Sequence, residues 1–241
     1  MAAHGKKYDQ AIKLIEPDKF YSPEEAASLV KKVAYANFDE TVEVHFKLGI
    51  DPRHADQQVR STASLPHGTG KQVRVIVFAE GEGARIAREA GIEEVGSDDL
   101  VQKIEGGFLD FDISIAMADQ MVKVGKLGRI LGRRGLMPNP RSGTVVRATE
   151  DLPRVLEEVR GGRVEFRNDR TGILHVGIGK KHFSEQQITE NMLSLVEAVN
   201  RAKPTGVKGI YVETITLTTS MSPGVPIDVA AALTPSGGAR R

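Results

Sequence analysis

Apolar residues follow two different periods along this chain, and the change between them constrains its domain organisation. Residues 41–48, TVEVHFKL, alternate strictly between polar and apolar. This alternation predicts a half-buried strand of an antiparallel sheet, whose polar face meets water or a partner. The runs VRVIVFA at 73–79 and DISIAMA at 112–118 are almost continuously apolar and are separated by predicted helices. Strands that alternate with helices in this way predict βαβ units and a parallel sheet.

The alternating pattern returns in the last third of the chain. Residues 162–179, GRVEFRNDRTGILHVGIG, predict a hairpin of two strands. Capping boxes at Ser22 and Ser184 predict helices before the first alternating strand and after the hairpin. In the last predicted strand, IYVETITLTT, the apolar parity changes between Val212 and Ile215, which predicts a β-bulge.

These patterns predict an α+β fold of two domains. Residues 1–67 and 161–230 form an antiparallel-sheet α+β domain, because one helix and one strand cannot bury a core alone. An α/β, Rossmann-like domain with a parallel sheet is inserted into it at 68–160, and residues 231–241 are expected to be a flexible tail. The chain passes between the two domains at two points, and the glycines at these crossings predict a hinge, formed by Gly68, Gly70, Gly161 and Gly162.

The composition excludes several classes of site. The sequence contains no cysteine, which excludes disulfides, thiolate catalysis and cysteine-ligated metal centres and fits a reducing cytosol. No apolar run reaches membrane-spanning length, and the first residues, MAAHGKKYDQAIK, lack the apolar core of a signal peptide. We therefore expect a cytoplasmic protein without membrane contact. Because the net charge is only +1, any surface that binds nucleic acid must have its charge segregated.

Positive charge is segregated in one glycine-rich segment, residues 121–147. Seven Lys or Arg residues and no Asp or Glu lie between Asp119 and Glu150. The segment is predicted to begin as a short amphipathic helix, which ends near Gly132 and opens into a basic loop. The residues expected to face inward are Val122, Leu127, Ile130 and Leu131. Like-charge runs often contact polyanions, although a solvated surface loop is an equal alternative. The candidates for RNA or tRNA contact are Lys126, Arg129, Arg133, Arg134 and Arg141.

Two glycine-containing stretches match nucleotide-binding loops only in part. HGTGK at 67–71 lacks the first glycine and the final Ser or Thr of a P-loop. GEGARI at 81–86 lacks the third glycine of a dinucleotide fingerprint, and Glu80 and Glu82 would repel a pyrophosphate. The six histidines show no metal-ligand spacing, and no group of residues forms a catalytic constellation. No catalytic residue, metal or cofactor is predicted, and an α/β enzyme that binds a nucleotide in the inserted domain is the alternative.

The polar face of the antiparallel sheet is a second candidate for RNA contact. Proteins recognise unstacked bases, 2′-hydroxyls and backbone with hydroxyls, amides, aromatic rings and arginines. Residues of these kinds enter the first strand, line the hairpin and end the last strand: Asn37, Phe38, Thr41, Arg163, Arg167, Asn168, Asp169, Arg170, Thr219, Ser220, Met221 and Ser222. The alternative for Phe38 is a core aromatic, and the alternative for Met221 is a residue that fills a gap in the core.

The string KLGRILGRRGLMPNPRSGTV resembles the signature of the large-subunit ribosomal protein L-one family. FDETVEVHFKLGIDPRHADQQVR, LPHGTGK, GRVEFRNDRTG and TTSMSPG also occur in the family's order and spacing, so the resemblance extends to about Val229. Arg133 stands where the family usually has proline, which makes the loop more basic and less rigid. In this family a Phe and a Thr-Met-Gly triplet form an RNA-contact cluster. Phe38 and Met221 match it directly, whereas Ser220 replaces the threonine and Ser222 the glycine.

The resemblance implies an architectural role instead of an enzymatic one. The protein is expected to bind large-subunit (23S-type) rRNA, to form the mobile stalk, and to assist release of deacylated tRNA from the exit site. It is also expected to repress its own operon by binding the mRNA, to contact other ribosomal components, and to be a monomer outside the ribosome. We expect the first domain to bind rRNA and the basic loop to face tRNA or a second RNA segment. Salt-sensitive binding of a structured RNA would favour this role, and nucleotide-dependent thermal stabilisation would favour the enzyme.

Overall fold

The chain forms two compact units in the computed structural model, which describes residues 5–71 and 73–234. Unit 1 comprises Met1–Lys71 and Gly161–Arg241, and unit 2 is Gln72–Arg160. The domain boundaries predicted from the sequence lie after residues 67 and 160. That each unit folds independently stays a prediction.

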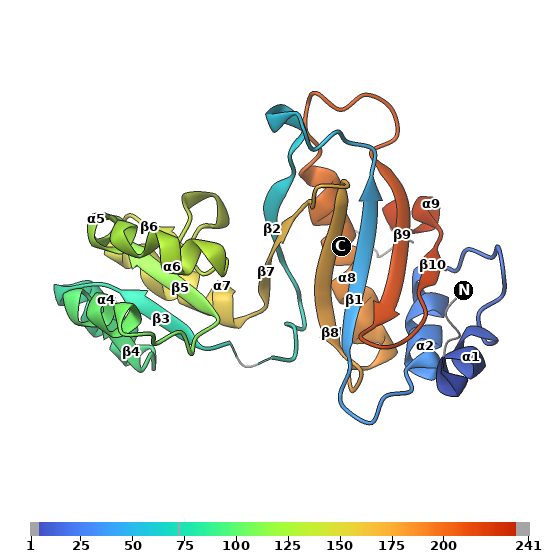
Figure 1. Cartoon of the computed structure of the whole chain (residues 1–241), viewed down its shortest axis with the longest axis horizontal. Coiled ribbons are helices and arrows are strands. Elements are labelled where there is room, and N and C mark those ends of the chain that lie inside the picture. The colour runs from blue at the N-terminus through green and yellow to red at the C-terminus, as the bar shows by residue number, and fades with distance from the viewer. Residues whose placement is uncertain (1–4, 72, 235–241) are drawn as a thin grey trace, which may run out of the picture. The chain divides into compact units, whose positions relative to one another are not determined.

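Unit 1 is built on a four-stranded antiparallel sheet with helices against one face (Figure 1). The sheet order is β10 (Val225–Ile227), β9 (Val212–Thr219), β1 (Thr41–Leu48) and β8 (Ile173–Lys180). A separate antiparallel pair joins β2 (Arg60–Ser64) to β7 (Arg163–Arg167). The helical elements are α1 (Lys6–Ile12), α2 (Pro23–Val33), η1 (Ala55–Gln57), α8 (Glu185–Arg201) and α9 (Val229–Leu233).

The alternation of β1 decides which face of this sheet is buried. Its four apolar residues are buried, and its four polar residues are half-buried on the opposite side. Helices α2 and α8 pack their apolar stripes into the same core as the buried residues of β1. Both helices begin with the predicted capping boxes, at Ser22 and Ser184. We call the opposite face, which presents the polar residues of β1, the open face.

The predicted hairpin at 162–179 is wrong in its pairing. β7 pairs with β2 and β8 pairs with β1, so the two strands belong to different sheets. The chain does turn between them, where the N–H of Asp169 donates to the carbonyl of Ile173 at 2.9 Å. The partner strand β2, RSTAS, has only one apolar residue, so the sequence pattern did not reveal it.

At the end of the chain one prediction is confirmed and another is partly wrong. Lys47 pairs with Thr214 whereas Leu48 pairs with Val212, which is the predicted bulge in the last strand. Residues 231–233 of the expected flexible tail instead belong to α9 (Val229–Leu233), and the carboxylate of Asp228 caps α9 by accepting from two backbone N–H groups. Residues 235–241 of the predicted tail lie outside the described residues.

Unit 2 is a parallel sheet with an apolar cluster on each face. The sheet order is β4 (Glu94–Gly96), β3 (Val75–Phe78), β5 (Ile113–Met117) and β6 (Val145–Val146). Its helices are α3 (Gly81–Glu89), α4 (Asp98–Glu105), α5 (Met121–Val124), α6 (Gly128–Arg133) and α7 (Leu152–Arg160). Short 3-10 turns are η2 (Ala118–Gln120), η3 (Gly125–Leu127), η4 (Pro140–Ser142) and η5 (Thr149–Asp151). The predicted fold class, α+β with a Rossmann-like parallel-sheet insertion, is confirmed.

The basic segment begins as two short helices instead of one. The 3-10 turn η3 separates α5 from α6 and shifts the helical phase. Leu127 and Leu131 are buried as predicted, but Val122 is 83% exposed and Val124 lies in the core in its place. The expectation that Val122 faces inward was therefore wrong.

The glycines at the two crossings are in close contact within unit 1. Gly162 has a φ of +100°, and a Cβ atom there would lie 2.3 Å from the Cα of Gly68. The carbonyl of Gly68 also accepts a hydrogen bond from Nδ2 of Asn191, on α8, at 2.8 Å. These contacts hold Gly68 and Gly162 within unit 1. The hinge stays a prediction, and its motion would take place outside these two residues.

Candidate nucleic-acid interface

Two large apolar side chains are exposed at one end of the antiparallel sheet. Phe38 is 56% exposed and Met221 is 51% exposed. Phe38 precedes β1 and Met221 follows β9, and these strands pair with Val42 opposite Thr219, so both loops lie at the same end. The core alternatives for the two residues are therefore wrong. An apolar pair on a polar surface is a feature of binding sites.

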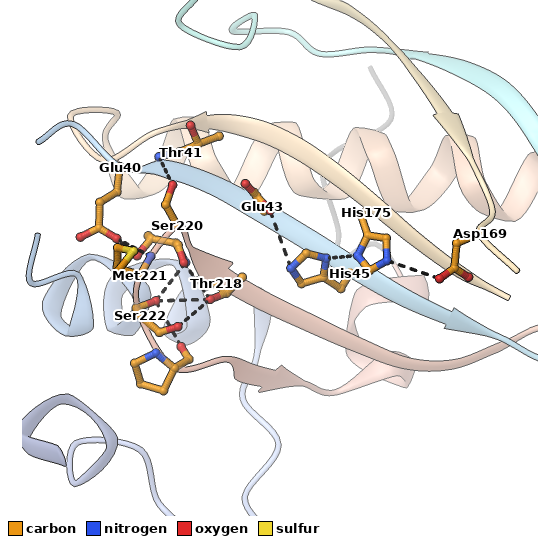
Figure 2. A network of polar contacts seen from close by, with 12 residues as sticks. Glu40, Thr41, Glu43, His45, Asp169, His175, Thr218, Ser220, Met221 and Ser222 are labelled. Atoms are coloured by element: carbon orange, nitrogen blue, oxygen red, sulfur yellow. Dashed lines mark hydrogen bonds and ion pairs between the residues drawn. The ribbon is translucent and has the colours of Figure 1, made fainter. Parts of the chain in front are cut away.

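A buried carboxylate joins the two loops that carry these side chains (Figure 2). Glu40 has no exposed surface. Its Oε1 accepts from the N–H of Ala36 at 2.7 Å, and its Oε2 accepts from the N–H of Met221 at 3.0 Å. Oε2 also accepts from the hydroxyl of Thr219 at 2.6 Å. Hydrogen bonds to a buried carboxylate are strong because they replace its lost hydration, so Glu40 fixes one loop against the other.

Two serines shape the loop after β9 with their hydroxyl groups. The N–H of Thr41 donates to Oγ of Ser220 at 3.1 Å, and the N–H of Ser220 donates to the carbonyl of Thr41 at 3.1 Å. Oγ of Ser222 accepts from the N–H of Thr219 at 2.9 Å. The serine that replaces the glycine of the resembled pattern therefore closes the turn itself. Asn37 is exposed beside this cluster and Thr41 is half-buried.

Glu40 was not predicted from the sequence, and Thr219 has a different role from the predicted RNA contact. Thr219 is 2% exposed and its hydroxyl is used by Glu40, so its side chain supports the loop instead of facing RNA. Glu40 lies two positions before Val42, the first buried residue of β1. Extending the alternation back by one step places this carboxylate on the buried face, which is the signal that could have identified it.

The predicted residues of the turn before β8 lie at the other end of β1. Lys47 pairs with Ile173 there, and the eight residues of β1 span about 25 Å. Arg167 and Arg170 are exposed, and neither side chain makes a hydrogen bond or ion pair with another described residue. A pocket of about 400 Å³ is lined by Pro52, Gln58, Arg167, Asn168, Asp169 and Arg170. The two arginines make this end a second candidate contact for phosphate.

Asn168 is buried and Asp169 is exposed, and both support this turn through side-chain hydrogen bonds. Oδ1 of Asn168 accepts from the N–H of Val59 at 2.7 Å, and its Nδ2 donates to the carbonyl of Asp169 at 2.9 Å. The carboxylate of Asp169 accepts from the N–H groups of Ile173 and Thr171, each at 2.8 Å. The N–H of Ile173 and then the hydroxyl of Thr171 lower the pKa of Asp169 to about 2. Both side chains therefore have a structural role, and their contact with RNA stays a prediction.

Arg163 lies at the opposite end of β7 from Arg167. It belongs to β7, in the separate β2–β7 pair, and its Nη2 donates to Oγ1 of Thr62 at 3.4 Å. The predicted hairpin, which placed Arg163 and Arg167 along one ribbon with β8, is not formed.

Unit 2 presents a group of exposed cations. Four of the predicted residues are exposed and make no hydrogen bond or ion pair through their side chains with another described residue: Lys126, Arg129, Arg133 and Arg134. The side chain of Arg141 lies outside the described part of the structure. Lys123 differs, because its Nζ lies 2.8 Å from Oδ2 of Asp98 and 2.6 Å from Oε1 of Glu80. Hydrogen bonds to Asp98 and then Glu80 raise the pKa of Lys123, so its charge is neutralised internally.

The same ion pairs occupy the edge where a doubly wound sheet would bind a nucleotide. Such ligands bind beyond the carboxyl ends of the strands, where the strand order reverses, which here is between β3 and β5. Glu80 follows β3 and Asp98 follows β4, and Lys123 bridges them. Two carboxylates at this edge disfavour the binding of a phosphate group.

Residues 5–71 and 73–234 lack two further features. They contain no group of three or more His, Asp or Glu side chains arranged to bind a metal ion. They also contain no helix that is both long and apolar enough to span a membrane.

Comparison with known proteins finds relatives of one name over nearly the whole chain. A family model described as the ribosomal protein L1p/L10e family matches residues 30–223. The protein named large ribosomal subunit protein uL1 of Thermomicrobium roseum is 63% identical over 230 residues, which cover 95% of each chain. The proteins of that name from Chloroflexus aggregans and Dehalococcoides mccartyi are 57% and 56% identical and cover 96% of this chain. The matches cover 98% and 97% of those two relatives.

Proposed function

Because the chain belongs to the ribosomal protein L1p/L10e family, we propose that it binds the rRNA of the large ribosomal subunit directly, as a structural protein of that subunit. The observation that carries this proposal is the pair Phe38 and Met221, exposed on two loops that share the carboxylate of Glu40. An exposed ring on a rigid support can stack on an unpaired base without a large loss of entropy. The role is architectural and involves no chemical step.

The cationic groups divide the RNA contacts between the units. Arg167 and Arg170 lie at the far end of the open face and suit the phosphate backbone of the RNA that stacks on Phe38. The exposed cations of unit 2 suit a separate polyanion, the tRNA in the exit site or a second rRNA segment. The protein would then form the mobile stalk and assist the release of deacylated tRNA.

Other parts of the proposed role follow from the same surface. A site that recognises a folded rRNA element also binds an mRNA with the same fold, so we include repression of its own operon. The protein would act in the cytoplasm, on the large subunit beside other ribosomal components, and would be a monomer when free. The large-subunit name of its relatives supports the association with that subunit.

Binding of a large-subunit rRNA fragment to the full chain tests the proposal. The expected result is a one-to-one complex whose affinity falls as salt rises, because phosphate contacts release counterions. A parallel thermal-unfolding series with ATP, GTP and NAD should show no shift in midpoint. Stabilisation by a nucleotide together with no RNA binding would favour the enzyme alternative instead.

A further inference from the structure

Two histidines face each other at the centre of the open face, between the two ends described above (Figure 2). His45 of β1 is the direct cross-strand partner of His175 of β8. Their Nδ1 atoms lie 2.9 Å apart, and the rings meet edge to face with centroids 4.9 Å apart. Neither histidine was assigned a role from the sequence. Both are reachable from solvent, with side-chain exposures of 27% and 54%.

Each imidazole has a carboxylate on its other side. Nε2 of His45 lies 3.9 Å from Oε2 of Glu43, and Nε2 of His175 lies 3.8 Å from Oδ2 of Asp169. Asp169 is kept ionised by its pKa of about 2. The four groups therefore form a row across the open face: carboxylate, imidazole, imidazole, carboxylate.

A count of protons shows which charge state this row suits. An imidazole nitrogen that faces a carboxylate should carry a proton, which places one proton on each Nε2. The two facing Nδ1 atoms need one more proton between them, because two bare lone pairs 2.9 Å apart repel each other. The arrangement is therefore satisfied by three protons, which is one more than two neutral imidazoles carry. A neutral pair instead leaves one Nε2 lone pair facing a carboxylate.

The surroundings oppose that third proton in the free protein. Burial and then the neighbouring His175 lower the pKa of His45, while Glu43 acts in the opposite direction. Thr216, the cross-strand partner of His45 on β9, is neutral, and Lys47 binds the carbonyl of Thr171. The ionisable groups on the strands and turn around the pair are Glu43 and Lys47 of β1, Asp169 and Arg170 of the turn, Lys180 of β8 and Glu213 of β9. The core beneath the sheet is apolar.

We propose that the His45–His175 pair lies within the RNA interface and takes up one proton from solvent when RNA binds. The proton forms the third N–H of the pair and changes the net charge of the row of four groups from −2 to −1, which reduces the repulsion between this row and the RNA backbone. An anion brought to the open face supplies the stabilisation that the free protein lacks. This inference rests on the proposed RNA binding, and it makes that binding sensitive to pH near neutrality.

Titration calorimetry of the full chain with the large-subunit rRNA fragment tests this, at several pH values between 7.5 and 6.0. Measurement in two buffers of different ionisation enthalpy gives the number of protons taken up. The expected uptake approaches one, so the affinity should rise by up to about tenfold for each unit fall in pH. His45→Gln and His175→Gln should bind at pH 7.5 but lose most of this rise. Urea unfolding at pH 7.5 establishes that both variants are folded.

Two matched variants separate the pair from other histidines. His54 lies 3.7 Å from Asp51 and contacts no second imidazole among the described residues. His182 lies 2.8 Å from Asp39, which follows Phe38 in the sequence. His54→Gln and His182→Gln should keep the whole rise in affinity. RNA binding without proton uptake, uptake that survives in His45→Gln and His175→Gln, or uptake that disappears on adding EDTA would each overturn the inference. Absence of RNA binding at every pH would instead count against the proposed function.

Discussion

The carboxylate of Glu40 accepts a hydrogen bond from the backbone N–H of Met221 at 3.0 Å, although the residues are 181 positions apart in the chain. The other oxygen of this carboxylate accepts from Ala36, in the loop that carries Phe38. The two exposed apolar side chains are thus positioned by one buried charge. The shape of the interface therefore depends on a residue that does not contact the RNA.

Replacing this charge by an amide should loosen both loops. In Glu40→Gln one acceptor becomes an NH₂ donor, which leaves either the N–H of Ala36 or the N–H of Met221 without a partner. We expect a loss of about 1–3 kcal/mol in the free energy of unfolding, measured with urea. Glu24→Gln, an exposed change on α2, is the control and should be neutral. Equal stability of the two variants would show that Glu40 does not tie the loops together.

The acid stability of unit 1 should depend on Asp169. Its pKa is about 2 in the folded chain against 3.8 for an ordinary aspartate, so its hydrogen bonds stabilise the fold above about pH 4 and are lost as the pH falls towards 2. Asp169→Asn should therefore be less stable than the unsubstituted chain at pH 5. The two urea midpoints should converge near pH 2. A difference that stays constant from pH 5 to pH 2 would contradict this assignment.

Removal of unit 2 should leave a folded, RNA-binding protein. Unit 1 has its own apolar core, and Gly68 and Gly162 are in contact, so a short Gly/Ser linker can replace Gln72–Arg160. The shortened chain should unfold cooperatively and lose less than about tenfold in affinity for a minimal rRNA fragment. Non-cooperative unfolding would show that unit 1 needs the insertion in order to fold.

The cations of unit 2 should contribute to RNA binding only through charge. Arg134→Ala should lower the magnitude of the log–log salt slope by about 1 for each lost phosphate contact, in complexes that engage unit 2. Arg85→Ala is the control, because Arg85 already pairs with Glu82 and Glu89 on α3. The minimal rRNA fragment should bind both variants as it binds the unsubstituted chain. If Arg85→Ala changes the slope as much as Arg134→Ala, the basic loop has no special role.

Local sequence patterns predicted the elements that depend on local physics. The capping boxes at Ser22 and Ser184, the alternation of β1 and the bulge near Val212 all appear in the structure. Each of these is set by residues a few positions apart, and the fold class followed from them. Val122 was wrongly predicted to face inward, because the 3-10 turn at Gly125–Leu127 interrupts the helical period between α5 and α6.

The remaining errors concern partners that are distant in the chain. β7 was assigned to β8 because they are adjacent in sequence, whereas its partner β2 lies about 100 residues earlier and has a weak pattern. Glu40 was missed because its donors, Thr219 and Met221, approach it only after β1 and β9 pair. The His45–His175 pair likewise exists only through the register of β1 with β8. Strand register could not be derived from one sequence.

The central claim, that the exposed Phe38–Met221 pair contacts rRNA, is tested most directly by a matched pair of phenylalanine variants. Phe38 and Phe20 are 56% and 64% exposed, so either change to alanine should leave the stability of unit 1 nearly unchanged in urea. Binding of the large-subunit rRNA fragment is then measured across a series of salt concentrations. We predict that Phe38→Ala costs roughly 1–3 kcal/mol of affinity with an unaltered salt slope, and that Phe20→Ala costs nothing measurable. Equal affinities of the two variants would contradict the claim.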